Sequence, residues 1–284
     1  MGAAEVMRSL SLKVDVRHPY LLDTCGTGGD EASTFNISTA SAFVAAAAGA
    51  KVAKHGNRSV SSQCGSADIL EMSGVFLGLN SEQVARCIDS VGVGFIFAPQ
   101  HHQAMKQVAA PRQELGVRTI FNLLGPLTNP ANARKQVLGV YSPTWVPIIA
   151  EVLLQLGTER ALVVHGNGLD EVTIDGETVV SEVKDGEVVS YQVSPATLGV
   201  MGHSLDVIRV YSREDSLSMF KLALGEVKGK IHPAQDILAL NAGAAIYVAG
   251  LVDQWKRGID FAYDLIYSGL AYQKLQELIE FTRF

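Results

Sequence analysis

The sequence predicts an α/β protein with a mostly parallel central sheet flanked by helices. Two observations indicate this class. Up to residue 166, short apolar runs alternate with helical stretches, and this alternation is typical of parallel βαβ units. Beyond residue 170, short β runs are separated by Asp-Gly turns, which predicts antiparallel strands. From about residue 213 the pattern is mostly helical, so helices are expected to complete the layers around the sheet.

The predicted parallel strands are short apolar runs that end in a polar loop or just before a helix. They lie at 20–25, 51–55, 93–99, 136–141 and 160–166. The segment 170–193 supplies the antiparallel strands, with turns at its Asp-Gly pairs. Because the parallel strands alternate with helices, their carboxyl ends are expected to meet at one edge of the sheet.

The first predicted helix begins near Ser38 and closes at Gly49, and Asn36, Ser38 and Thr39 are its candidate N-cap residues. Its alanines would let it lie close against the sheet. Further helices are predicted at 67–74, 81–92, 101–116, 143–157, 232–252 and 259–281. Pro111 is expected to kink or break the helix at 101–116, and Pro143 stands at the helix start that proline favours.

Composition limits the possible functions. The chain has 284 residues, of which 48% are hydrophobic and 18% charged, and this suits a compact protein with a sizeable core. A net charge of −6 argues against broad binding to nucleic acid or anionic membrane. No run of 18 apolar residues predicts a membrane span, and the N-terminus lacks the pattern of a secretory signal.

The three cysteines, Cys25, Cys64 and Cys87, form no CxxC pair. This spacing argues against a structural zinc site and a disulfide framework. Unpaired thiols fit a reducing compartment, so the predicted location is the cytoplasm.

A glycine-rich loop, "CGTGGD" at 25–30, ends the first strand and precedes a helix. Glycines let backbone N–H groups approach an anion, and a helix N-terminus favours negative charge. The loop therefore indicates phosphate or pyrophosphate binding, although it matches neither the P-loop nor the dinucleotide pattern. The alternative is a plain glycine-rich turn.

A second polar loop, "KHGNRSVSSQCGS" at 54–66, follows the next strand. Two such loops at one sheet edge could wrap a polyanion, with Lys54 and Arg58 supplying charge and the serines supplying directional hydrogen bonds. The alternative is a solvated loop with surface charges.

Two further clusters are candidates for chemistry. Asp170 and Glu171 follow a strand, and adjacent carboxylates suit Mg²⁺, which also binds phosphates; the alternative is ordinary turn residues. The segment 98–116 carries His101, His102 and Arg112. Arg112 could pair with a substrate carboxylate, while solvated arginines and structural histidines are the alternative.

These motifs together closely resemble the anthranilate phosphoribosyltransferase family. The matching stretches include "DTCGTGGD", "TFNISTASA", "KHGNRSVSS", "CGSAD", "FAPQHHQAMKQVAAPRQELGVRTIFNLLGPLTNP" and "GLDEV", and the resemblance runs from about residue 18 to residue 275. It implies an enzyme of tryptophan biosynthesis. The enzyme would join anthranilate to 5-phosphoribosyl 1-pyrophosphate (PRPP), with Mg²⁺, and release pyrophosphate.

The resemblance also implies roles for individual residues, with no general acid or base assigned. The implied PRPP contacts are Gly26, Gly29, Asp30, Thr34, Asn36, Ile37, Ser38, Thr39, Lys54, His55, Gly56, Asn57, Arg58, Ser59, Val60, Ser61, Ser62 and Ser66. The implied anthranilate contacts are Gly26, Asn57, His102 and Arg112. The implied magnesium ligands are Ser38, Asp170 and Glu171.

The chain departs from the family at its N-terminus. Family members carry several helices ahead of the glycine loop, which form part of a small helical lobe and of the homodimer contact. Here only about twenty residues precede "YLLDTC". Residues 1–17 are therefore expected to be a remnant of that lobe and 18–284 the α/β domain. We expect the chain to bind PRPP but to associate weakly or differently.

Three alternatives stay open at this point. A pyrimidine nucleoside phosphorylase would share the fold but need a nucleobase site. A binding protein of the same fold, for instance one that binds nucleic acid, would need a basic surface. An inactive member would keep the fold alone.

Overall fold

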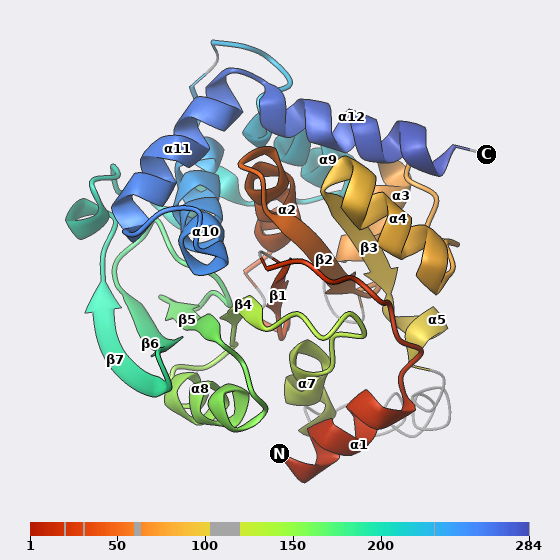
Figure 1. Cartoon of the computed structure of the whole chain (residues 1–284). Coiled ribbons are helices and arrows are strands. Elements are labelled where there is room, and N and C mark those ends of the chain that lie inside the picture. Colours follow the sequence, from red (N-terminus) through yellow and green to blue (C-terminus); the bar gives the residue numbers. More distant parts are fainter. Residues whose placement is uncertain (20, 31, 60–63, 103–119, 230, 284) are drawn as a thin grey trace.

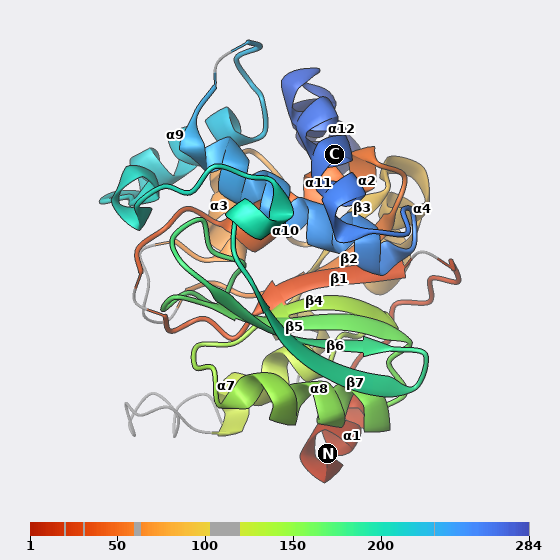
Figure 2. The same ribbon diagram turned by 90° about the vertical axis from the view of Figure 1, so that its left-hand side faces the viewer.

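The computed structural model describes all residues except 20, 31, 60–63, 103–119, 230 and 284. Its described strands form a seven-stranded sheet in the order β3-β2-β1-β4-β5-β6-β7 (Figure 2). The strands are β1 (Leu21–Gly26), β2 (Lys51–Gly56), β3 (Val93–Phe97), β4 (Lys135–Gly139), β5 (Arg160–Gly166), β6 (Thr178–Lys184) and β7 (Glu187–Val193). The predicted α/β class is confirmed.

The sheet is parallel from β3 through β5, and β6 and β7 add antiparallel strands at one edge, as the sequence predicted. The chain builds β1, β2 and β3 toward one side and then returns to place β4 on the other side of β1. Such a reversal opens a crevice at the carboxyl ends of the strands, where ligands of α/β sheets bind.

Helices cover both faces of the sheet (Figures 1 and 2). The larger layer contains α2 (Ile37–Ala47), α3 (Ser66–Met72), α4 (Ser81–Val91), α9 (Arg213–Ala223), α10 (Pro233–Ala249), α11 (Trp255–Tyr267) and α12 (Leu270–Thr282). The opposite layer contains α1 (Gly2–Leu10), α7 (Ile120–Leu124) and α8 (Trp145–Gln155). Shorter elements are α5 (Ala98–His101), η2 (Gly125–Leu127), η3 (Ala196–Leu198) and η4 (Leu205–Ile208).

Two apolar clusters correspond to these two layers. The larger lies between the sheet and the layer of α2 and α10, and the smaller lies under α8 and includes Ala4 of α1. Helix α10 is buried on nearly its whole circumference, which explains why its sequence lacks a polar face. Helix α1 is fixed to the second layer by Arg8, whose Nε donates to the carbonyl of Leu127 across 2.7 Å.

Several predicted boundaries were wrong. Helix α8 begins at Trp145, so Pro143 precedes it instead of starting it. The predicted helix at 259–281 is two helices, because Gly269 adopts a φ of +79° between α11 and α12. Antiparallel pairing starts only at Thr178. Of the helix predicted at 101–116, His101 closes α5, His102 is its C-cap and 103–119 lie outside the described residues.

In the described ranges of the chain, no helix combines the length and the apolar character that a membrane crossing requires.

Candidate active site

The acidic pair lies at the point where the crevice opens. Asp170 and Glu171 follow β5, and both accept hydrogen bonds from the main chain of the first glycine loop and of α2. The N–H of Gly28 donates to Oδ2 of Asp170 across 2.6 Å. The N–H of Ser38, in the first turn of α2, donates to Oε1 of Glu171 across 2.9 Å. The structure thus brings together three regions that the sequence analysis selected separately.

Two glycines make the close approach of Asp170 possible. A Cβ atom at Gly26 would lie 2.3 Å from Oδ2 of Asp170, and one at Gly139 would lie 1.5 Å from its carbonyl oxygen. Real Cβ atoms do not come so close to other atoms, so a side chain at either position would displace the acidic pair. Gly28 and Gly29 have φ values of +67° and +77°, which only glycine adopts without strain.

Negative charge is crowded at this point. Burial, followed by the nearby carboxylate of Asp30, raises the pKa of Asp170. Burial and then the charge of Asp170 raise the pKa of Glu171 well above its usual range, and Lys54 opposes this effect only in part. Like charges held together out of water repel each other, and a bound cation would offset this repulsion. The donor set therefore fits a magnesium ion.

The side chains that the structure describes do not complete such a site by themselves. Among the residues that the structure describes, no group of three or more His, Cys, Asp or Glu side chains is placed to hold a metal. Mg²⁺ commonly binds one or two carboxylates and takes its other ligands from water and substrate phosphates. The arrangement therefore suits an ion that arrives with a phosphorylated ligand.

Lys54, which the sequence analysis placed against a polyanion, is directed into the protein. Its side chain is 3% exposed, and its ammonium donates to the carbonyl of Thr24. Burial lowers its pKa, while the charges of Asp23, Glu171 and Asp170 act in the opposite direction. Lys54 therefore acts on the acidic pair through the electrostatic effect of its positive charge.

The start of α2 agrees with the expectation in part. Asn36, one of the three predicted N-cap candidates, is the N-cap residue of α2, so that prediction is confirmed, although its side chain makes no capping bond; Ser38 and Thr39 lie inside the helix. The side chain of Asn36 donates to the carbonyl of Cys64 across 3.0 Å and accepts from Ser216 across 3.3 Å. It therefore joins the two predicted ligand loops to α9. The hydroxyl of Thr39 is buried with no partner in the described part.

Asp68 of α3 closes the second loop. Its Oδ2 accepts from the N–H groups of Ser59 and Gly65, across 3.1 and 2.9 Å. Arg58 pairs with Asp68 and also with Glu71, at 3.0 and 2.7 Å, so carboxylates of this chain already offset its charge.

Other predicted residues of these loops are placed as follows. The hydroxyl of Ser66 donates to the carbonyl of Asn57 across 3.2 Å. Thr34, beside Ser33, forms an isolated bridge with Arg209. Ile37 is buried in the first turn of α2, and Gly56 ends β2. Val60, Ser61, Ser62 and Arg112 lie outside the described residues.

Two buried histidines lie near the carboxyl ends of β2 and α5. The rings of His55 and His102 lie 5.0 Å apart between centroids. Burial lowers the pKa of His102 to about 4 and also lowers the pKa of His55 well below its usual range. The Nε2 atom of each is buried with no partner among the described residues. Both rings are therefore neutral at pH 7.

Sequence reasoning missed Gly139, Asp68 and Asn241. Asp68 stands three residues after Gly65, the spacing of a capping box, and this signal could have found it. Asn241 is an amide within the apolar run of α10, and such an isolated polar residue is a second usable signal. Gly139 gives no signal of its own, because its partner is distant in sequence.

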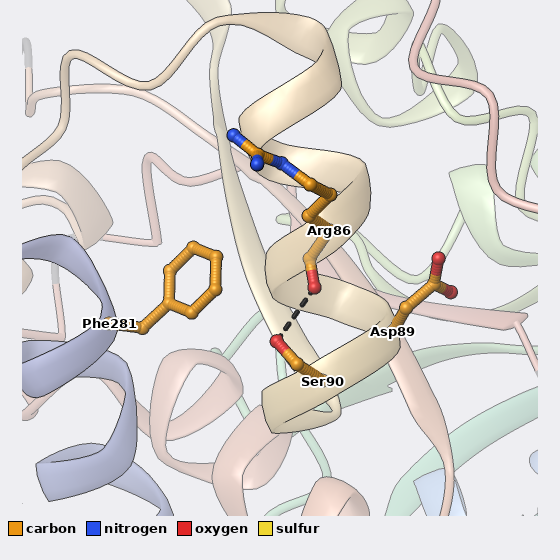
Figure 3. Close-up of a pocket in the computed structure, with 4 residues that line it drawn as sticks. All are labelled: Arg86, Asp89, Ser90 and Phe281. Carbon is orange, nitrogen blue, oxygen red and sulfur yellow. Dashed lines mark hydrogen bonds between the residues drawn. The ribbon is translucent and has the colours of Figure 1, made fainter.

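A surface hollow lies elsewhere, between α4 and α12 (Figure 3). Arg86, Asp89 and Ser90 line it from α4 and Phe281 from α12, and the hydroxyl of Ser90 donates to the carbonyl of Arg86 across 2.7 Å. None of the predicted site residues lines this hollow.

Comparison with known proteins agrees with this geometry. Residues 18–272 match the model of the glycosyl transferase family, a/b domain, and this is the class that the fold and the site define. The chain is 56% identical to an anthranilate phosphoribosyltransferase of Marinomonas sp. over 283 residues, covering 99% of this chain and 82% of that one. A homologue of the same name from Hahella chejuensis is 55% identical with the same coverage. The chain therefore belongs to the anthranilate phosphoribosyltransferase family.

Solved structures give the same result. The anthranilate phosphoribosyltransferase of Thermus thermophilus superposes with a TM-score of 0.92 at 45% identity, covering 99% of this chain and 83% of that one. The enzyme from Saccharomyces cerevisiae in complex with PRPP and Mg superposes with a TM-score of 0.87 at 32% identity, covering 99% and 78%. Another structure of the yeast enzyme is a complex with 4-fluoroanthranilate.

Proposed function

We propose that this site transfers the phosphoribosyl group of PRPP to the amino group of anthranilate and releases pyrophosphate, with Mg²⁺. The observation that carries the proposal is the meeting of Asp170 and Glu171 with the first glycine loop at the start of α2. The second loop is linked to the start of α2 by the side chain of Asn36, which donates to the carbonyl of Cys64. The similarity to the yeast complexes with PRPP and Mg, and with 4-fluoroanthranilate, supports the same substrates.

The acidic pair and Ser38 would hold the metal together with phosphate oxygens of PRPP. When bound, Mg²⁺ would offset the negative charge that grows on the leaving pyrophosphate. The glycine loop from Gly26 to Asp30 and the loop from His55 to Ser66 would bind the donor from two sides. Their N–H groups and hydroxyls would fix its phosphates, so that ribose C1 faces the acceptor.

Anthranilate would bind between Gly26, Asn57, His102 and Arg112. The neutral rings of His102 and His55 offer this acceptor an uncharged surface, whereas its carboxylate requires a cation such as Arg112. The aromatic amine attacks ribose C1 while the bond from C1 to the pyrophosphate oxygen breaks. An aromatic amine is already nucleophilic, so no side chain of the chain is assigned as general base.

The direct experiment mixes the protein with anthranilate, PRPP and Mg²⁺ and follows the loss of anthranilate fluorescence. Turnover that depends on all three components supports the proposal. No turnover in folded protein overturns it. Phosphorolysis of thymidine or uridine, measured in parallel, tests the nucleoside phosphorylase alternative.

The proposal also covers the domains of the chain, its association and its location in the cell. We assign residues 1–17 to a helical lobe and 18–284 to the α/β domain. Sedimentation equilibrium tests whether the chain associates with a second copy of itself. Cys25, Cys64 and Cys87 are all free thiols, which supports a reducing location such as the cytoplasm.

A further inference from the structure

We propose that Asn241 is a positioning residue for the metal-binding carboxylates, and that it acts by clamping the backbone directly after Glu171. This inference rests on the proposed function, because it concerns how the same site holds Mg²⁺ with PRPP. Asn241 touches neither carboxylate side chain. Its contact is with the main chain of Val172.

The clamp uses both ends of the amide. Oδ1 of Asn241 accepts from the N–H of Val172 across 2.9 Å, and Nδ2 donates to the carbonyl of the same residue across 2.8 Å. Nδ2 also donates to the carbonyl of Ile237, one turn earlier in α10, across 2.9 Å. The side chain is therefore fixed to its own helix while it holds Val172 from two directions. Two opposed bonds to one residue restrict both its position and its rotation.

The setting argues for a specific role. Asn241 is 1% exposed in a helix whose neighbouring side chains are apolar. A buried amide costs free energy unless its bonds are made, so an apolar residue would suit this helix better if the loop needed no anchor. The other polar residues of α10 have other partners. Gln235 bonds to His232 at the helix start, and Asp236 pairs with His203 and Tyr263.

The clamp completes a set of anchors around the acidic pair. Gly28 holds Asp170, Ser38 holds Glu171, and Asn241 holds the next residue. Both carboxylates stand on one short stretch of backbone and accept from main-chain N–H groups, so a shift of that backbone would move both metal ligands at once. Asn241 resists this movement from the side of the sheet that α10 covers. Without Asn241, the carboxylates of Asp170 and Glu171 would occupy a wider range of positions around a bound metal.

The test compares two changes in one helix. Asn241→Leu removes the clamp at similar volume, and Gln235→Leu is the matched control, since Gln235 is equally buried but caps the helix start. Binding of Mg²⁺ in the presence of PRPP is measured by calorimetry, and the Mg²⁺ dependence of turnover in parallel. Outer partners of metal ligands typically contribute 10–100-fold in affinity, so Asn241→Leu is expected to weaken Mg²⁺ binding about tenfold. Gln235→Leu should leave it within about twofold.

Urea unfolding shows whether each variant folds. If Asn241→Leu does not fold, Asn241→Ser replaces it: the shorter side chain gives up both bonds to Val172, and the same roughly tenfold loss of Mg²⁺ affinity relative to the wild type is expected. If Asn241→Leu and Gln235→Leu bind Mg²⁺ with equal affinity and are equally stable, the inference is overturned. The proposed function then still stands, provided that the wild-type protein turns over. A wild-type protein that binds Mg²⁺ and PRPP without turnover overturns the proposed function alone.

Discussion

The N–H of Ser38 and Oε1 of Glu171 form a 2.9 Å hydrogen bond between residues 133 positions apart in the chain. A carboxylate from the loop after β5 therefore occupies the start of α2, where the helix dipole favours negative charge. A phosphorylated ligand at the same helix start would meet this carboxylate. Its binding requires a cation between the two, and the crowded negative charge of Asp170 and Glu171 explains why that cation should be divalent.

The first prediction follows from the charge of this pair. In Asp170→Asn and Glu171→Gln the amide oxygen can still accept from the Gly28 or Ser38 N–H, but one negative charge is lost. Because burial and repulsion already oppose ionisation, the free energy of unfolding at pH 7 should stay unchanged or rise. Turnover at fixed Mg²⁺ should fall at least about 100-fold, since a metal ligand is lost. Urea unfolding and the fluorescence assay measure the two quantities. Equal losses of stability and turnover would make the pair structural.

The second prediction concerns the space beside Asp170. Gly26→Ala would place a methyl group 2.3 Å from Oδ2 of Asp170 and force the carboxylate to move. We expect destabilisation of about 1–3 kcal/mol, together with weaker binding of Mg²⁺ with PRPP. Gly125→Ala is the control, because its added Cβ meets nothing within 4 Å. Calorimetry and urea unfolding that give the same result for both variants would contradict the close approach.

The third prediction separates two carboxylates that share one partner. Asp68 and Glu71 both pair with Arg58, but only Asp68 also accepts from two N–H groups of the second loop. Asp68→Ala should therefore raise the KM for PRPP about tenfold, because two charge-assisted bonds that shape the loop are lost. Glu71→Ala removes an exposed ion pair, which contributes less than about 1 kcal/mol, and should leave the KM nearly unchanged. A KM that responds equally to both changes would assign the effect to Arg58.

Local sequence patterns were enough to predict the parallel strands and the position of the two polar loops at their ends. Apolar runs that alternate with helical stretches indicate βαβ units, and glycines and serines after a strand indicate a loop. The position of the acidic pair was also predictable, because it lies in the loop that follows β5. Each of these features depends on residues close together in the chain.

The remaining features depend on tertiary contacts. Lys54 was expected to face a ligand, yet it is buried beside Asp23 and donates to the carbonyl of Thr24, because the pairing of β2 with β1 brings these residues together. Helix α2 was expected to be capped by a local side chain, but Glu171 reaches its first turn from the loop after β5. Gly139 is needed only because Asp170 approaches it. Such requirements cannot be predicted until the fold brings the partners together.

The last prediction uses the buried histidine pair. Burial lowers the pKa of His102 from its usual value of 6.5 to about 4, and it also lowers the pKa of His55. Between these two pH values the unfolded chain binds a proton at His102 that the folded chain does not. The free energy of unfolding should therefore be highest above pH 6.5 and fall as the pH drops toward about 4.

Replacing His102 removes its share of this slope. Between pH 7.5 and 5, His102→Gln should lose about 1–2 kcal/mol less stability than the wild type, while His55 keeps the rest of the dependence. His18→Gln is the control, because His18 precedes β1 and is not part of the pair formed by His55 and His102. Urea midpoints across this pH range measure the slopes. A slope in His102→Gln as steep as that of the wild type would mean that His102 is already protonated in the folded protein.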